Sequence, residues 1–517
     1  MFKISPRPAR IAAGVAAIAL VGSGIAATAA APVAKPAPRL AAGTYLVGAA
    51  TRDITPIGVV NQGGYGLGDG SFFPEAAIGR GGRDKAKGEH IRSRAMVVDD
   101  GIGAIAIADI ETQGYFTKYQ DGPYGIEDIS KRVAKLRPGL KADHILIASD
   151  HTHAGPDSIG AWGGVSDSYM ATIANQTVAA IVDAYDQRRL SHIVAGSSDA
   201  SDLIYNQSCS EALNQSKHPS YTGPSLCATP GKDGLVRVLQ ARDLAGKTVV
   251  TYMAYAAHGT AGGGNGLHGD WAQFVSDEMA RRFGGVGLAM VGALGGTQPC
   301  RAACSFTSPK NPGYNLTDRK SAIVTNYMAH VVASLKVAKP VSGPVDGKQS
   351  YIREPITGPI VSGLFMAGSH TGTHLMRSTQ SPYVVGQTIR TIASSLRIGG
   401  VLINGTPGEG FPSIGAGVRS ATTGWQMEIQ LGLANDQLGY LIAPLSYVPI
   451  IAAQVAINDN IIFNVSPTIG DHVMCADIRL SIALGFAGTS PVTCAPYDAV
   501  DATGDPIGAI PVGGITL

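Results

Sequence analysis

Short apolar runs alternate with amphipathic segments along the chain after residue 43, which is the pattern of a mixed α/β protein. Apolar, β-type runs flank turn residues in two places, and each arrangement predicts a hairpin. The predicted hairpins join Ala95–Val98 to Ala104–Ala108 and Leu235–Gln240 to Val249–Tyr255. Two further short apolar runs, Ile145–Ala148 and Val401–Asn404, are predicted to be buried strands.

Three segments have helical periodicity. Ile126–Leu136 is amphipathic and is followed by Pro138 and Gly139, which favour a helix end. Asp270–Phe283 and Asp318–Leu335 are also predicted to be helices. No fixed-period repeat is present, so the fold class expected is α/β, with mixed β-sheets covered by helices.

The N-terminus has the features of an export signal. Lys3, Arg7 and Arg10 precede an apolar run that ends in Ala-Thr-Ala at residues 27–29. We therefore expect a signal peptide over residues 1–29 and a Pro/Ala-rich linker over 30–43. An uncleaved membrane anchor is the alternative, because the apolar run is long enough to span a bilayer. Either reading predicts a secreted or cell-envelope protein.

Composition and charge limit the function classes. The 517 residues are 45% hydrophobic and 15% charged, which favours a large folded core. The net charge is +2, and loss of the three leader cations leaves 37 basic against 38 acidic groups. The sequence contains no cluster of basic residues, so a nucleic-acid partner is not expected. The longest later apolar run, Val448–Ile457, contains Pro449 and is too short to cross a membrane.

The six cysteines favour disulfides in an exported protein. Nearest-neighbour pairing would join Cys209 to Cys227, Cys300 to Cys304 and Cys475 to Cys494, although six cysteines allow 15 pairings. A thiolate zinc site at the Cys300-x-x-x-Cys304 pair is disfavoured, because no second pair with suitable spacing follows.

Candidate catalytic groups follow predicted strands. His151 and His153 come after the strand Ile145–Ala148 and point to one side if the segment is extended. His258 follows another apolar run, and Glu409 lies in a Gly-rich turn after Val401–Asn404. Taken singly, each has an ordinary structural explanation. Together, imidazoles and a carboxylate are typical of a catalytic zinc site.

Other motifs give weaker signals. The chain contains neither Gly-x-Ser-x-Gly nor His-Glu-x-x-His, which disfavours serine α/β-hydrolases and zincin proteases. Asp270 is expected either to orient a ligand imidazole or to cap a helix. His268 is expected either to line the site or to be exposed, and a second metal site at His370 and His374 is disfavoured.

The motif order resembles the zinc-dependent N-terminal domain of the neutral, non-lysosomal ceramidases over roughly residues 44–450. The resemblance centres on His151-Thr152-His153-Ala154-Gly155-Pro156. Its other segments are Tyr45–Gly48, Asp53–Pro56, Gly64–Gly66, Arg94-Ala95, Ala108–Ile110, Ala257-His258, Gly269-Asp270, Phe365–Gly368, Pro407–Glu409 and Leu438–Tyr440.

This resemblance implies an amidohydrolase that uses a zinc-activated water. It implies that zinc is bound by His151, His258, Glu409 and Tyr440. His153 would transfer protons as the catalytic residue. The implied substrate is a small-molecule N-acylated lipid or another apolar amide, with peripheral membrane contact left open. The sequence does not indicate the oligomeric state.

Four departures leave alternatives open. Gln207 stands where the family has a substrate-contacting arginine, and Tyr447 is the nearest substitute for a second family tyrosine. The segment Gly295–Pro299 differs from the family loop, and 77 residues after Tyr440 leave little or no room for an immunoglobulin-like domain. We therefore expect a hydrolase domain over 44–450 and a packed extension over 451–517. A zinc esterase or lactonase, or a non-catalytic metal-stabilised envelope protein, is the alternative.

Overall fold

The computed structural model describes residues 40–57, 60–64, 90–162, 164–206, 231–263, 266–299, 316–357, 386–442, 463–466, 468–489 and 499–500. Within these ranges the largest element is a nine-stranded sheet in the order β4-β3-β2-β1-β5-β7-β8-β9, with β11 paired to β5. Its strands are β1 (Tyr45–Asp53), β2 (Arg92–Asp99), β3 (Ala104–Ile110), β4 (Ile145–Ser149), β5 (Arg189–Asp199), β7 (Leu235–Asp243), β8 (Thr248–Tyr255), β9 (Val286–Val291) and β11 (Lys339–Pro340).

A second, five-stranded sheet has the order β17-β14-β13-β12-β20. Its strands are β12 (Val345–Pro355), β13 (Thr388–Ile398), β14 (Val401–Gly405), β17 (Met427–Leu431) and β20 (Ala499–Val500). Both sheets are mixed, because β3 and β4, β8 and β9, and β14 and β17 pair in parallel while their other neighbours are antiparallel.

Three short two-stranded ladders complete the described strands. They join β6 (Ile204–Asn206) to β10 (Thr297–Pro299), β15 (Glu409–Gly410) to β18 (Tyr440–Leu441), and β16 (Thr422–Thr423) to β19 (Ala487–Gly488).

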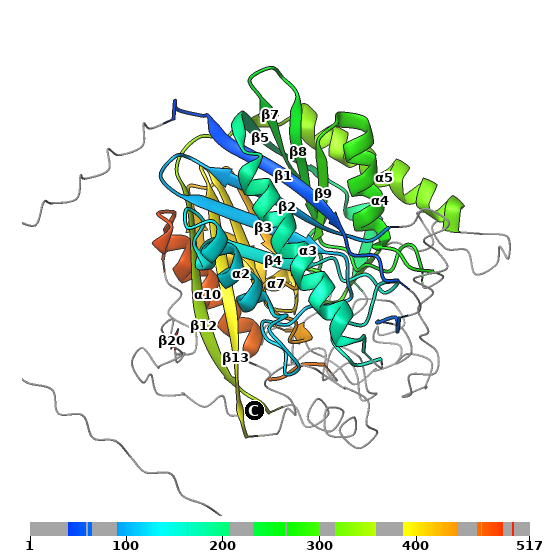
Figure 1. The fold of residues 1–517 in the computed structure, drawn as a ribbon. Coiled ribbons are helices and arrows are strands. Elements are labelled where there is room, and N and C mark those ends of the chain that lie inside the picture. Colours follow the sequence, from blue (N-terminus) through cyan, green and yellow to red (C-terminus); the bar gives the residue numbers. More distant parts are fainter. Residues whose placement is uncertain are drawn as a thin grey trace, which may run out of the picture. The chain divides into compact units, whose positions relative to one another are not determined.

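Six α-helices lie within the described ranges, and they are shown in Figure 1. They are α2 (Ile126–Leu136), α3 (Asp167–Asp186), α4 (Asp270–Phe283), α5 (Leu316–Lys336), α7 (Pro412–Ala421) and α10 (Ile469–Ala483). Two of these helices start with ordinary capping chemistry. The Ser166 side chain accepts the Tyr169 N–H at the start of α3, and Pro412 opens α7 at a position that needs no N–H donor.

The packing forms helix, sheet, sheet and helix layers. Alternate residues of β8 show this, because Tyr252 faces the second sheet while Met253 packs under α4 and α5. Helices α2 and α3 cover the β1 to β4 part of the same large sheet. On the second sheet, α10 packs on β12 and β13 and also touches α7.

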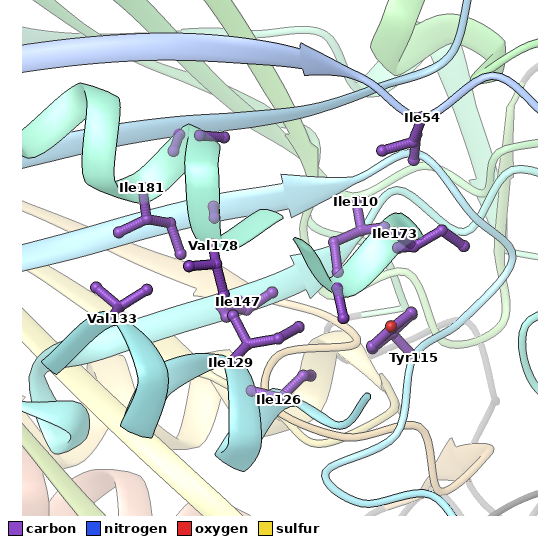
Figure 2. Packing of buried hydrophobic residues seen from close by; sticks show 14 of the residues in the cluster. Ile54, Ile110, Tyr115, Ile126, Ile129, Val133, Ile147, Ile173, Val178 and Ile181 are labelled. Carbon is purple, nitrogen blue, oxygen red and sulfur yellow. The ribbon is translucent and has the colours of Figure 1, made fainter. Parts of the chain in front are cut away.

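Figure 2 shows the apolar contact under α2 and α3. Ile129 and Val133 of α2 and Val178 and Ile181 of α3 gather around Ile147 of β4. All of these side chains are buried, so this layer holds β4 in place from one face. The strand whose end carries the first candidate site residue is therefore rigidly supported.

The predicted α/β class with mixed sheets and covering helices is confirmed. Both predicted hairpins form, and helices Ile126–Leu136 and Asp270–Phe283 have the predicted bounds. The third predicted helix is slightly longer, at Leu316–Lys336. None of the helices in the described ranges is both long and apolar enough to span a membrane. Cys475 is buried in α10, whereas the other five cysteines lie outside the described residues.

Candidate metal centre

Strands of both sheets end at one place and bring the predicted site residues together. His151 follows β4 and His258 follows β8, so both histidines come from the large sheet. Glu409 and Tyr440 follow β14 and β17 of the second sheet and are paired directly in the β15–β18 ladder. The centre thus lies where the two sheets meet, and four chain segments contribute to it.

The donor atoms of these residues converge. His151 Nε2 lies 3.4 Å from Glu409 Oε2, and His258 Nε2 lies 3.1 Å from the same oxygen. The Tyr440 hydroxyl is 3.4 Å from His258 Nε2, and His153 Nε2 is 3.4 Å from His151 Nε2. Ligand atoms of the three histidines all lie within 4.8 Å of one another, so this group could hold a metal ion.

The spacing fits a small divalent cation. Ligands held at about 2.0–2.1 Å in a tetrahedron lie about 3.3–3.4 Å apart, which is close to the separations observed here. Nitrogen and carboxylate donors are those that zinc prefers. The donor chemistry and the spacing therefore fit a zinc ion, and His153 lies within the same group as the other donors.

Main-chain carbonyl groups fix the orientation of two imidazoles. His151 Nδ1 donates to the Gln113 carbonyl oxygen at 2.7 Å, and His258 Nδ1 donates to the Thr297 carbonyl oxygen at 2.8 Å. With Nδ1 protonated, the Nε2 lone pair of each neutral ring faces the centre. These carbonyl partners were not identified from the sequence, because main-chain acceptors carry no residue-type signal.

The backbone at His151 corrects one sequence-based expectation. The segment is not extended, since His151 has φ 54° in the left-handed region, which non-glycine residues adopt rarely. The two imidazoles still meet, because His153 N–H donates to the Gly259 carbonyl oxygen at 3.0 Å and brings its ring back toward the centre. A turn, rather than strand alternation, puts both rings on one site.

Burial and charge set the protonation preferences of the metal-free centre. Burial raises the pKa of Glu409, but the interactions with His151 and His258 outweigh it and hold that pKa well below its ordinary value. Burial, His151 and His258 together hold the pKa of His153 well below its ordinary value. Glu409 is therefore a carboxylate and His153 a neutral imidazole in the metal-free centre.

Asp270 has neither of its predicted roles. The helix N-cap is Gly269, and the Asp270 carboxylate accepts the N–H groups of Trp271 at 2.7 Å and Gly262 at 2.8 Å. Asp270 thus shapes the loop that follows His258. His268 is fully buried rather than exposed, and its ring packs on Phe274 with centroids 5.2 Å apart.

Comparisons with known proteins place the fold. No known family profile matches the chain, and no curated protein matches it. A solved ceramidase complexed with C2 matches with a TM-score of 0.65 and 16% identity, covering 87% of this chain and 79% of that one. The neutral ceramidase from Pseudomonas aeruginosa matches with a TM-score of 0.64 and 17% identity, covering 90% and 80%.

The chain has the neutral ceramidase fold. The similarity predicted from the motif order is thereby confirmed at the level of the fold, at low sequence identity. Motifs of the predicted resemblance that can be located on this ceramidase fold include His151–Pro156, His258 and Pro407–Glu409. Residues Phe365–Gly368, Gln207, Tyr447, His370 and His374 lie outside the described residues.

Glycines are a second feature of this ceramidase-fold centre that the sequence analysis did not assign. A Cβ on Gly259 would lie 2.4 Å from the His151 carbonyl oxygen, and one on Gly295 would lie 2.5 Å from the Glu409 carbonyl oxygen. Real Cβ atoms do not approach this closely. The backbone segments that carry the donors therefore pack directly against one another, without side chains between them.

Proposed function

We propose that this protein is an exported, zinc-dependent amidohydrolase that cleaves the amide bond of an N-acylated, ceramide-like lipid. The observation that carries the proposal is the convergence of His151, His153, His258, Glu409 and Tyr440 in a chain with the neutral ceramidase fold. In this proposal His151, His258, Glu409 and Tyr440 bind zinc, and His153 is the catalytic residue. The hydrolase domain spans 44–450, with residues 1–29 as signal peptide and 451–517 as a packed extension.

The chemistry divides between the metal and the chain. Bound zinc would lower the pKa of a water molecule toward ~7 and polarise the acyl carbonyl. His153 is neutral, is only partly buried, whereas His151 and His258 are buried, and has its Nε2 3.4 Å from His151 Nε2, which puts a proton acceptor beside the metal ligands. It takes the proton of the attacking water and delivers that proton to the leaving amine. The Gln113 and Thr297 carbonyls keep the His151 and His258 rings from turning away.

Ester or lactone hydrolysis is the second candidate. It is favoured by Gln207 at the position where the similar family has an arginine, because a neutral amide stabilises a developing oxyanion less than a guanidinium does. An ester has the better leaving group and depends less on that stabilisation. A non-catalytic metal site is the third reading. Such a site has closed ligation and does not need an imidazole, here His153, that lies beside the metal without binding it.

The deciding experiment combines metal analysis with two substrates. Zinc content is measured for the purified protein, for His151→Ala, and for His192→Ala, which alters an exposed histidine. Each is assayed with a fluorogenic N-acyl sphingosine and with a simple acyl ester. We expect about one zinc per chain and amide cleavage, both lost in His151→Ala and kept in His192→Ala. Cleavage of the ester but not the amide would indicate a zinc esterase or lactonase. Bound zinc without cleavage of either substrate would indicate a non-catalytic metal site. Absence of zinc from the wild-type protein refutes the proposal.

A further inference from the structure

Asp150 lies between the end of β4 and His151, and its side chain closes a tight turn. Its Oδ1 accepts the Thr152 N–H at 3.2 Å, which is the hydrogen bond of an Asx turn. Its own N–H donates to the carbonyl oxygen of Ile110, the last residue of β3, at 3.4 Å. This hydrogen bond fixes the first residue of the turn to the large sheet. The Asp150 side chain is completely buried.

The other end of the turn is anchored as well. The Thr152 hydroxyl donates to the His268 carbonyl oxygen at 2.7 Å, and Thr152 forms a parallel bridge with Gly259. His151 is the single residue between the two anchored positions, and it is the residue with φ 54°. Turns of type II and type I′ place a residue of positive φ at the position that His151 occupies here. The two anchored ends therefore hold the His151 backbone in this conformation, and with it the direction of the ring.

We propose that Asp150 is a positioning residue that holds His151 in its left-handed conformation and aims Nε2 at the metal centre. The inference deepens the proposed function and rests on it for the role of His151 as a ligand. Asp150 acts through the turn and not by touching substrate or metal. Its Oδ2 has no hydrogen-bond partner among the described residues, although it is buried. The contact of Oδ1 with the Thr152 N–H is thus the hydrogen bond that accounts for an acidic side chain buried at this position.

The test compares substitutions that keep or remove the acceptor. Asp150→Asn keeps an oxygen for the Thr152 N–H, whereas Asp150→Ala removes it. The control is Asp243→Ala, which breaks a similar Asx turn to the Ala245 N–H, at the opposite end of β8 from His258. Zinc affinity of the full chain is measured by competition with a chromogenic chelator. The tautomer of His151 is measured in parallel by nitrogen NMR of histidine-labelled protein without metal.

We expect Asp150→Ala to bind zinc about 10- to 100-fold more weakly and to lose the Nδ1–H form of His151 that faces the Gln113 carbonyl. Asp150→Asn and Asp243→Ala should keep both properties. Wild-type affinity in Asp150→Ala overturns the inference, as does a loss in Asp150→Asn as large as that in the alanine variant. Should Asp150→Ala fail to fold, Asp150→Leu takes its place, because leucine has a similar branched shape and no acceptor oxygen. Wild-type zinc affinity in that variant overturns the inference. Should the wild-type protein bind no zinc, the proposed function fails, while the tautomer measurement still tests the turn.

Discussion

Glu409 and Tyr440 are register partners in a parallel ladder only two residues long, and each also reaches His258. The ladder delivers a carboxylate and a phenol to the same imidazole as one unit. Glu409 N–H donates to the Gly439 carbonyl oxygen at 2.8 Å, which ties the two segments together next to the donors. A change in either segment is therefore expected to disturb both donors.

Replacement of the carboxylate should weaken metal binding. Glu409→Gln preserves the shape of the side chain but removes the charge that faces His151 and His258. We expect zinc affinity to fall by at least about tenfold, measured by chelator competition. The matched control is Glu354→Gln, because Glu354 is also buried and paired with a histidine, His472. Equal zinc affinity in the two variants would contradict the assignment of Glu409.

His153 should be needed for turnover and not for metal retention. His153→Ala removes the proposed proton acceptor and leaves His151, His258, Glu409 and Tyr440 in place. We expect hydrolysis to fall by about 10²- to 10⁴-fold while the zinc content stays at the wild-type level. His153 Nε2 is only 3.4 Å from His151 Nε2, so the opposite result is informative. Loss of zinc in this variant would show that His153 is itself a ligand.

A methyl group at Gly259 should disrupt the centre. Its Cβ would lie 2.4 Å from the His151 carbonyl oxygen and 2.9 Å from Thr152 Cα, both main-chain atoms that cannot move alone. We expect Gly259→Ala to weaken zinc binding even in the molecules that remain folded. Zinc affinity is measured by chelator competition and stability by thermal unfolding. The control is Gly196→Ala, where the Cβ would meet the Ser334 carbonyl oxygen at 2.2 Å, between β5 and α5. That variant should lose stability and keep the zinc affinity of its folded form.

Asp270 should make stability depend on pH. Burial raises the pKa of Asp270 to about 7, although backbone hydrogen bonds from Trp271 and Gly262 oppose the shift. Between the ordinary aspartate pKa and about 7, the folded protein keeps a proton that the unfolded chain releases. Stability should therefore fall as pH rises through this window, by about 1.4 kcal/mol per pH unit for one proton, and level off above it.

The measurement is urea unfolding at several pH values for the wild-type protein and Asp270→Asn. The difference in unfolding free energy between the two proteins removes the contribution of other groups. That difference should decline from about pH 4 to about pH 7. A difference that stays constant across this range would show that Asp270 titrates normally in the folded state.

Local sequence patterns predicted the helices and strands, because the periodicity of apolar residues and the residues that end a helix act within a short stretch of chain. The helix Ile126–Leu136 has an apolar face and is followed by a proline and a glycine, so its bounds follow from periodicity and from these helix-ending residues. The site residues were predicted from motif order, and the structure brings them together. The left-handed His151 and the main-chain acceptors at Gln113 and Thr297 could not be predicted, because they depend on which segments meet. The pairing of Glu409 with Tyr440 likewise depends on how separate strands are placed.

The candidate metal ligands follow strands of two different sheets, and this has a consequence for the order of folding. His258 and Glu409 are 151 residues apart in the chain, and Tyr440 is 182 residues from His258. Contacts of such sequence separation form after the entropy of closing long loops has been overcome, which places them late in folding. The complete donor set therefore exists only after both sheets have docked. Capture of a metal ion would mark the end of folding, and a chain arrested with the sheets apart would present no complete centre to the ion.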